Sequence, residues 1–395
     1  MLIQSFQDSI KLPSLGFVCM RLPLTADQQM DQAHVQQMVD AAMAAGANYF
    51  DTAYPYHGGL SELAIGKALQ KYPRESYFLA DKYPGHQPTS RYNPAEVFED
   101  QLKKCGVEYF DFYLLHNVYE NSIGVYLDPQ WNIIPYFLEQ RRLGRIKHLG
   151  FSTHARTENL STILDQLGSG MEFCQIQLNY LDWTLQDAKA KYELLTERGI
   201  PVWVMEPLRG GKLANLSEAD TALLHSLRPE ESPAAWAFRW LLELPNVQVI
   251  LSGMSSFPQM EDNLKTFSAQ RPLSKEESEL LLRLAEGMKG ALPCTRCRYC
   301  TAGCPMGLDI PMLIHAYNDY RFASSMTVPM QFDALRPEEL PSACIGCGAC
   351  AAICPQQIDI PSVMTEFAEM VRHFPSWAEI SRQREEAAKK LKAAK

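Results

Sequence analysis

The sequence has no long apolar run. Its apolar stretches fall well short of the roughly 18 residues that a helix needs to span a bilayer, so we predict no transmembrane segment. The first residues, MLIQSFQDSIKLP, also lack the basic segment and following apolar run of a secretory signal peptide. These two absences lead us to expect a cytoplasmic protein without membrane association.

Basic residues are also fewer than acidic ones, with 37 Lys and Arg against 46 Asp and Glu. The 395 residues carry a net charge of −9, whereas a protein that binds nucleic acid usually presents a basic face. A hydrophobic content of 46% with 21% charged residues is typical of a globular protein. The length exceeds that of one ordinary domain, and it suits a barrel of about 250 residues followed by a smaller domain.

Cysteine is scarce over most of the chain. Before residue 294 it occurs as Cys19, Cys105 and Cys174, which we expect to be small, buried, apolar side chains. The other eight cysteines crowd into residues 294–354, in the stretches CTRCRYCTAGCP and CIGCGACAAICP. Both stretches are spaced C-x2-C-x2-C-x3-C-P, and in a cytoplasmic chain such clustering indicates metal sites rather than disulfides.

Apolar runs alternate with amphipathic segments over the first 270 residues. The segment NPAEVFEDQLKKCG has helix-start signals at Asn93, Pro94 and Glu96, and Ser232 before Pro233 is a second such start. Eight buried strands with helices between them predict a parallel α/β fold, and the eightfold count favours a closed TIM (β/α)8 barrel over an open sheet. The expected strands lie near residues 14–18, 48–50, 77–81, 110–115, 147–151, 173–178, 201–205 and 247–251.

The pattern changes after about residue 272. We predict a barrel over residues 1–272, a connecting helix over 273–290, a small and mostly helical two-cluster domain over 291–375, and a charged helical tail over 376–395. The roughly forty residues between the two cysteine motifs, including MLIHAYNDYRFASS, favour helices in that interval.

Polar side chains follow three successive predicted strands. Asp51, Lys82 and His116 each stand at or beside a strand end, and Tyr56 follows Asp51 by five residues. Alone, each has an ordinary structural reading, such as a cap, a surface charge or a satisfied core histidine. Active sites of TIM barrels lie at the carboxyl ends of the strands, so the four together indicate a catalytic site.

These residues resemble the catalytic tetrad of the aldo-keto reductase family. The resemblance covers roughly residues 10–270 and continues through GFSTH, QIQLNY, MEPLRGGKL and ILSGMSSFPQMEDNL. It implies NAD(P)-dependent interconversion of an aldehyde or ketone with an alcohol. Tyr56 would exchange the proton, Lys82 would favour its phenolate form, Asp51 would hold Lys82, and His116 would orient the carbonyl oxygen.

The same resemblance implies a set of cofactor-binding residues. They divide into nicotinamide contacts, a pyrophosphate loop and an adenosine end: Ser152, Gln175 and Met205; Leu208, Arg209, Gly210 and Gly211; Ser255, Gln259 and Asn263. Met205 stands where many relatives stack an aromatic ring on the nicotinamide. The stretch 252–263 contains no Lys or Arg to bind a 2′-phosphate, so the choice between NADP and NAD stays open.

The cysteine motifs resemble those of bacterial ferredoxins with two 4Fe-4S clusters. Structural zinc is the alternative, but it usually uses separated C-x2-C pairs. In such ferredoxins the fourth cysteine of each motif ligates the other cluster, with Gly346 and Gly348 leaving room for it. Carried over, one cluster takes Cys294, Cys297, Cys300 and Cys354, and the other takes Cys344, Cys347, Cys350 and Cys304.

Nicotinamide transfers a hydride, whereas these clusters pass single electrons. The clusters could exchange electrons with a redox protein partner, could stabilise the tail, or could belong to an electron-transfer module whose barrel does no hydride chemistry. The intact tetrad weighs against the last alternative, and two clusters in series favour electron transfer. No convincing flavin motif is present. We expect a small carbonyl or alcohol substrate in a pocket lined by Tyr54, His57, Tyr83 and Trp183.

Overall fold

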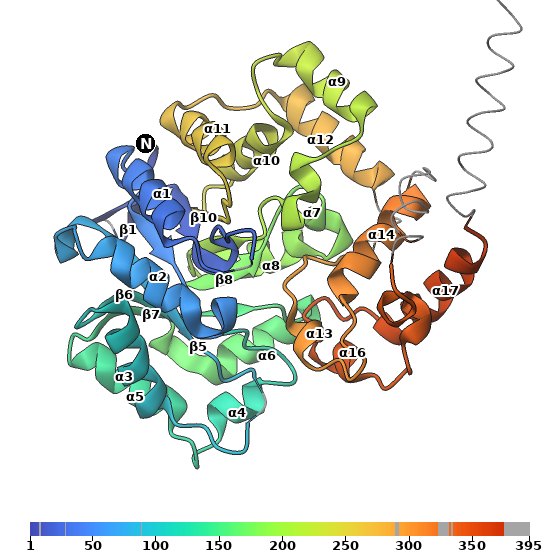
Figure 1. Cartoon of the computed structure of the whole chain (residues 1–395). Helices are drawn as coiled ribbons and strands as arrows, with labels where there is room; N and C mark the ends of the chain where they lie inside the picture. The colour runs from blue at the N-terminus through green and yellow to red at the C-terminus, as the bar shows by residue number, and fades with distance from the viewer. Residues whose placement is uncertain are drawn as a thin grey trace, which may run out of the picture. The chain divides into compact units, whose positions relative to one another are not determined.

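The computed structural model describes residues 1–7, 9–27, 29–87, 89–288, 292–322, 332 and 335–374. It divides into two compact units, the first spanning Met1–Ala285 and the second beginning at Glu286 (Figure 1). The predicted charged tail over 376–395 lies outside the described residues. No helix in the described ranges is both long and apolar enough to cross a membrane.

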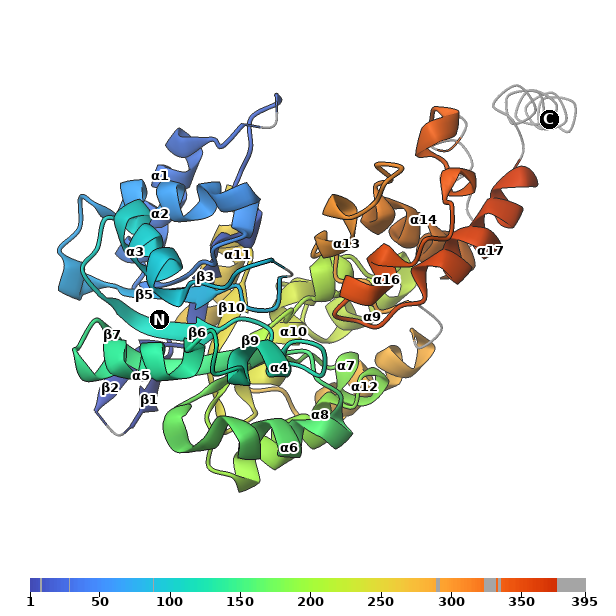
Figure 2. The same ribbon diagram turned by 90° about the horizontal axis from the view of Figure 1, so that it is seen from below.

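The first unit is built on a closed barrel of parallel strands, as predicted. The barrel strands are β3 (Leu15–Val18), β4 (Tyr49–Asp51), β5 (Phe78–Tyr83), β6 (Phe110–Leu115), β7 (Ile146–Thr153), β8 (Cys174–Gln177), β9 (Val202–Met205) and β10 (Val247–Ser252). Each strand pairs with the next along the chain, and β10 pairs with β3 to close the ring (Figures 1 and 2). The TIM (β/α)8 prediction is therefore confirmed.

Helices surround the barrel and connect its strands. They are α1 (Gln32–Ala44), α2 (Leu60–Leu69), α3 (Pro94–Cys105), α4 (Ile123–Leu127), α5 (Ile133–Arg142), α6 (Thr157–Leu167), α7 (Asp182–Leu185), α8 (Ala188–Glu197), α9 (Glu218–Leu227), α10 (Pro233–Leu242), α11 (Phe257–Ser268) and α12 (Lys275–Gly287). The predicted caps form, since Asn93 accepts a hydrogen bond from the Glu96 amide and Ser232 from the Ala235 amide. α12 lies within the interval expected for the connecting helix, and the domain boundaries themselves stay predictions.

Aromatic side chains fill the barrel near the starts of its strands. Trp203 donates a hydrogen bond to the Tyr49 hydroxyl at 3.0 Å, and its ring lies 4.4 Å from that of Phe173. A hairpin of β1 (Ile3–Phe6) and β2 (Ile10–Pro13) lies at this end of the barrel (Figure 2), with Phe6 packed edge-on against Trp203. The hairpin was not predicted, and it closes the end of the barrel opposite the carboxyl ends of the strands.

The second unit is mostly helical, as predicted. Its helices are α13 (Tyr299–Ala302), α14 (Ile310–Phe322), α16 (Ala349–Ile353) and α17 (Ile360–Arg372). Leu313 and Tyr317 of α14 pack with Met364 and Phe367 of α17 in a small core of its own. In the first unit the three scattered cysteines are buried, as predicted for free cysteine side chains.

Candidate functional sites

Three of the predicted site residues stand at the carboxyl ends of adjacent strands. Asp51 is the last residue of β4, Lys82 lies near the end of β5, and His116 directly follows β6. All three side chains are buried. Because β4, β5 and β6 pair in this order, the strand ends carry these side chains to one place.

Lys82 and Asp51 form an ion pair inside the protein. Lys82 Nζ lies 2.5 Å from Asp51 Oδ1 and donates a second hydrogen bond to the Thr52 carbonyl oxygen at 2.7 Å. Both side chains are at most 1% exposed. Burial raises the pKa of the Asp51 carboxyl, and the Lys82 ammonium opposes that shift. Such a desolvated pair fixes the position of the lysine firmly.

Tyr56 lies close to both Lys82 and His116. It begins the 3-10 helix Tyr56–Gly59, and Lys82 Nζ is 5.1 Å from the centre of its ring. The ring also meets that of His116 edge-on, with 5.9 Å between centres. Burial lowers the pKa of the His116 imidazole well below its usual value, and His86 and Lys82 add to the effect. The structure thus brings all four residues of the predicted tetrad together, with a neutral imidazole.

Two further histidines stand near His116, and the sequence analysis did not single them out. The His86 ring lies 4.5 Å from the His116 ring, and burial lowers the pKa of His86 to about 4. Burial also lowers the pKa of His154 to about 3, with a contribution from His86. Both follow barrel strands, in KYPGH and GFSTH, so their position after a strand end was the signal available.

The opposite face of β5 carries a second polar network. Asp81 Oδ1 accepts a hydrogen bond from the Lys82 amide at 2.8 Å, and Gln101 of α3 donates to the Lys82 carbonyl at 3.1 Å. Glu62 of α2 pairs with Lys104 of α3 at 3.1 Å. Burial, followed by the charge of Glu62, raises the pKa of Asp81 well above its usual value. These groups hold the backbone of the candidate catalytic lysine from outside the barrel.

The predicted nicotinamide contacts are neighbours on three strands. Ser152 of β7 stands directly opposite Gln175 of β8, and the Gln175 amide nitrogen lies 3.6 Å from the sulfur of Met205 in β9. Ser152 Oγ accepts a hydrogen bond from the Asn117 amide. Among the described residues, nothing donates a hydrogen bond to the buried Gln175 Oε1. This acceptor fits the amide NH2 of a nicotinamide.

The predicted pyrophosphate loop follows β9 and opens the 3-10 helix Arg209–Ala214. Arg209 is 2% exposed, and its Nε lies 3.2 Å from Asp182 Oδ1. Within the described residues its Nη2 has no hydrogen-bond partner, so it fits a phosphate oxygen. The Gly210 amide donates to Glu206 Oε2 at 2.7 Å. Glu206 was not singled out from the sequence, although it is part of the MEPLRGGKL motif.

The predicted adenosine end lies around α11. Ser255 precedes the helix, and its amide donates to Gln259 Oε1 at 2.8 Å. Asn263 is buried, and its side-chain amide donates to Ser252 Oγ at 3.0 Å. The first two therefore meet at the start of the helix, whereas Asn263 ties the helix to the end of β10.

Not all of the aromatic residues expected in the substrate pocket lie there. The Tyr83 ring packs on Phe137 of α5 at 5.2 Å, in the layer between barrel and helices, so its assignment to the pocket is wrong. The Tyr54 ring faces Lys104 at 4.1 Å, and Trp183 packs edge-on against Trp240 of α10. His57 Nε2 accepts a hydrogen bond from the Leu22 amide.

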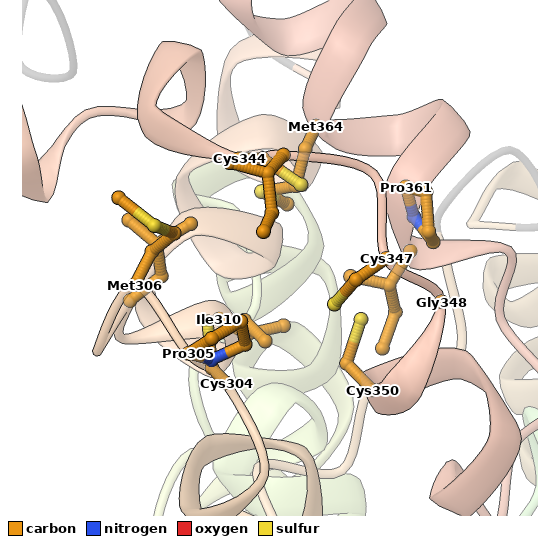
Figure 3. Close-up of a pocket in the computed structure, with 13 residues that line it drawn as sticks. Cys304, Pro305, Met306, Ile310, Cys344, Cys347, Gly348, Cys350, Pro361 and Met364 are labelled. Carbon is orange, nitrogen blue, oxygen red and sulfur yellow. The ribbon is translucent and has the colours of Figure 1, made fainter.

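In the second unit, cysteines from both motifs surround common cavities. One cavity is lined by Cys344, Cys347 and Cys350 of the second motif together with Cys304 of the first (Figure 3). Another is lined by Cys294, Cys297, Cys300 and Cys354. These are the two crossed sets that the ferredoxin resemblance implies, and α13 lies beside α16 where the motifs meet (Figure 1).

The remaining wall of each cavity is mainly apolar. Met306, Ile310 and Met364 line the cavity of Figure 3, and Ile314 and Ile358 line the other. In the described ranges, no three His, Cys, Asp or Glu side chains stand close enough together to hold a single metal ion. Cysteine sulfurs spread around an apolar cavity fit an iron–sulfur cluster, whose several iron atoms are each reached by one cysteine.

Comparison with known proteins agrees with this geometry. The profile described as "Aldo/keto reductase family" matches residues 15–286. The chain belongs to the aldo/keto reductase family. A second profile, "4Fe-4S dicluster domain", matches residues 293–358. The predicted combination of the two is thus confirmed, and this aldo/keto reductase is an oxidoreductase with an iron–sulfur domain after its barrel.

Individual relatives of this aldo/keto reductase are distant. An aldo-keto reductase of Mycobacterium avium (strain 104) is 25% identical over 289 residues, which are 72% of this chain and 90% of the relative. L-galactose dehydrogenase of Arabidopsis thaliana is 26% identical over 268 residues, 61% of this chain and 80% of the relative. The solved holo form of a Bacillus halodurans aldo-keto reductase is 26% identical with a TM-score of 0.57, covering 72% of this chain and 96% of that one.

Proposed function

We propose that the barrel interconverts an aldehyde or ketone with an alcohol, using NADP or NAD. The single observation that supports this most is the buried Lys82–Asp51 pair beside the Tyr56 ring, with the His116 ring edge-on to that ring. A carbonyl oxygen near Tyr56 and His116 would have a proton donor and a hydrogen-bond partner at once.

Each residue of the tetrad has its own role in the proposed reaction. A bound nicotinamide supplies or receives the hydride. Tyr56 gives its hydroxyl proton to the carbonyl oxygen in reduction and takes it back in oxidation, while the nearby Lys82 ammonium stabilises the phenolate. Asp51 holds Lys82 in place. His116, neutral because it is buried, orients the carbonyl oxygen without adding a charge.

Binding of the dinucleotide is assigned to three groups of side chains. Gln175 and Ser152 would hold the carboxamide, with Met205 against the ring. Arg209 and the loop Leu208–Gly211 would bind the pyrophosphate, and Ser255 with Gln259 and Asn263 the adenosine end. With no basic residue in 252–263, we expect discrimination between NADPH and NADH to stay within about tenfold, or about 1.4 kcal/mol.

For the second unit we propose two 4Fe-4S clusters that exchange electrons with a redox protein partner in the cytoplasm. The crossed cysteine sets around two cavities support this, because clusters held in this way form a relay. The same crossing supports a second candidate, in which the clusters only stabilise the unit. A flavin is not required by any residue that we assign.

The test uses full-length protein purified without oxygen. We expect about eight iron atoms per chain and turnover of small aldehydes with NADPH or NADH. Turnover that is equally fast after truncation before Cys294 would place the clusters outside the hydride path. A truncated barrel that binds cofactor but has lost activity would place them inside the catalytic cycle. Zinc in place of iron would remove the electron-transfer proposal.

A further inference from the structure

The loop after β9 is shaped to bind an anion. Its backbone is left-handed at several residues, with φ of 54° at Glu206, 48° at Arg209, 65° at Gly210 and 93° at Gly211. Non-glycine residues adopt such angles rarely, and they do so mainly where the chain is held for a function. Turns of this kind direct backbone N–H groups into a concave site for negative charge.

A carboxylate of the same loop occupies this site. Glu206 Oε2 accepts the hydrogen bond of the Gly210 amide at 2.7 Å. Meanwhile the Glu206 carbonyl accepts from the Arg209 amide at 3.1 Å and from the Asn179 side chain at 2.9 Å. Glu206 is therefore held by hydrogen bonds at both its side chain and its carbonyl group, and the side chain occupies the Gly210 amide.

Charged side chains of both signs act on the Glu206 carboxyl group. Arg21, from the 3-10 helix Cys19–Arg21, and Arg209 favour the ionised form of Glu206, and Asp182 of α7 opposes it. Asp182 is buried and also accepts hydrogen bonds from Gln177 and Asn179, so its side chain is held in place beside Arg209. Burial is the largest influence, and it raises the pKa of Glu206.

We infer that Glu206 competes with the dinucleotide pyrophosphate for this loop, and that the cofactor binds together with one proton taken up by Glu206. The inference rests on the proposed function, since it assumes that the dinucleotide binds at Arg209–Gly211. The proton comes from solvent and bonds to a carboxylate oxygen of Glu206. The Gly210 amide then turns to a phosphate oxygen, and the neutral carboxyl group can donate to the phosphate instead of repelling it.

A purely structural role for Glu206 gives the opposite expectation. If the side chain only held the turn in shape, it would keep its bond to Gly210 with the cofactor bound. Binding would then take up no proton, and the affinity would not follow the ionisation of Glu206.

The experiment is a titration of the full-length protein with NADH, followed by nicotinamide fluorescence from pH 6 to 9. NADH is chosen because it lacks the 2′-phosphate of NADPH, whose own ionisation near pH 6 would obscure the result. We expect Kd to rise with pH, approaching about tenfold per pH unit once Glu206 is ionised in the free protein. Calorimetry in two buffers of different ionisation enthalpy should show about one proton taken up per NADH.

Glu206→Gln should bind NADH with a nearly constant Kd over the same range. Glu218→Gln, at an exposed position of α9, is the matched control and should keep the wild-type slope. The inference is overturned if the wild-type Kd is flat and calorimetry shows no proton uptake, a result that does not depend on the folding of any variant. It is also overturned if Glu206→Gln folds and keeps the slope. If neither protein binds NADH or NADPH at any pH, the proposed function fails, and this inference fails with it.

Discussion

Lys82 Nζ lies 2.5 Å from Asp51 Oδ1 and 5.1 Å from the centre of the Tyr56 ring, with both members of the ion pair shielded from solvent. The electric field of an ammonium group in such a place acts strongly on its neighbours, because little water is present to screen it. The ammonium therefore acts on Tyr56 more strongly than it would if the same site were open to solvent.

Tyr56→Phe should lower turnover of aldehydes by at least about 100-fold, since it removes the proton donor. NADH binding, followed by nicotinamide fluorescence, should stay close to the wild-type value. Tyr54→Phe is the matched control, because the Tyr54 ring faces Lys104 rather than the tetrad. Wild-type turnover of the Tyr56 variant with several aldehydes would refute the assignment.

Asp81→Asn should change how stability depends on pH. The folded-state pKa of Asp81 is raised, so the folded protein holds its proton more tightly than the unfolded chain does. Stability is then lost as pH rises from the ordinary carboxyl range near pH 4 toward the raised pKa, with a slope of up to about 1.4 kcal/mol per pH unit. The neutral amide removes this slope.

Urea unfolding of the full chain between pH 5 and 9 measures this effect. Asp100→Asn is the control. Asp100 pairs with Lys104, as Glu62 does, but its side chain is 40% exposed. The explanation fails if Asp81→Asn and the wild type lose stability with pH in parallel.

Gly66→Ala should destabilise the barrel by about 1–3 kcal/mol. A Cβ at Gly66 would lie 2.7 Å from Cα and the carbonyl oxygen of Cys105, and these are backbone atoms of α3 that cannot rotate away. Thermal unfolding checks this. At Gly124 a Cβ would meet no described atom within 4 Å, so Gly124→Ala should leave the midpoint nearly unchanged.

Cys304→Ala and Cys354→Ala should each remove the cluster that has its other three cysteine ligands in the other motif. Cys304→Ala should resemble Cys347→Ala, and Cys354→Ala should resemble Cys297→Ala, because those pairs line the same cavities. Iron content and the electron paramagnetic resonance of the reduced protein give the comparison. Pairing within each motif would instead make Cys304→Ala resemble Cys297→Ala.

The parts of this protein that sequence predicted well are those fixed by local pattern. The barrel strands are short apolar runs, and the tetrad stands at their ends, so chain order was enough to find Asp51, Lys82 and His116. The crossed cysteines were available only through resemblance, since their spacing does not show which cavity Cys304 or Cys354 enters.

The sequence analysis missed features that are set by tertiary contacts, and it misplaced a residue because it did not consider which face of a strand each side chain takes. Glu62 and Asp81 meet because α2 packs against α3, which in turn packs on β5, and no spacing in the sequence reports that. Tyr83 was assigned to the pocket, yet it follows the inward-facing Lys82 and must point outward, because side chains alternate along a strand. The β1–β2 hairpin escaped notice because its strands, IQSF and IKLP, are only partly buried and lack the continuous apolar runs that mark the barrel strands.

The crossed arrangement of the cysteines also determines when each cavity is completed during synthesis of the chain. Cys294, Cys297 and Cys300 leave the ribosome well before Cys354, which completes their cavity. A cluster delivered to the first motif during synthesis would therefore find three ligands and an open side. Each cavity has its full set of four cysteines only after the second motif has emerged, so a cluster in either cavity would be completed after that point.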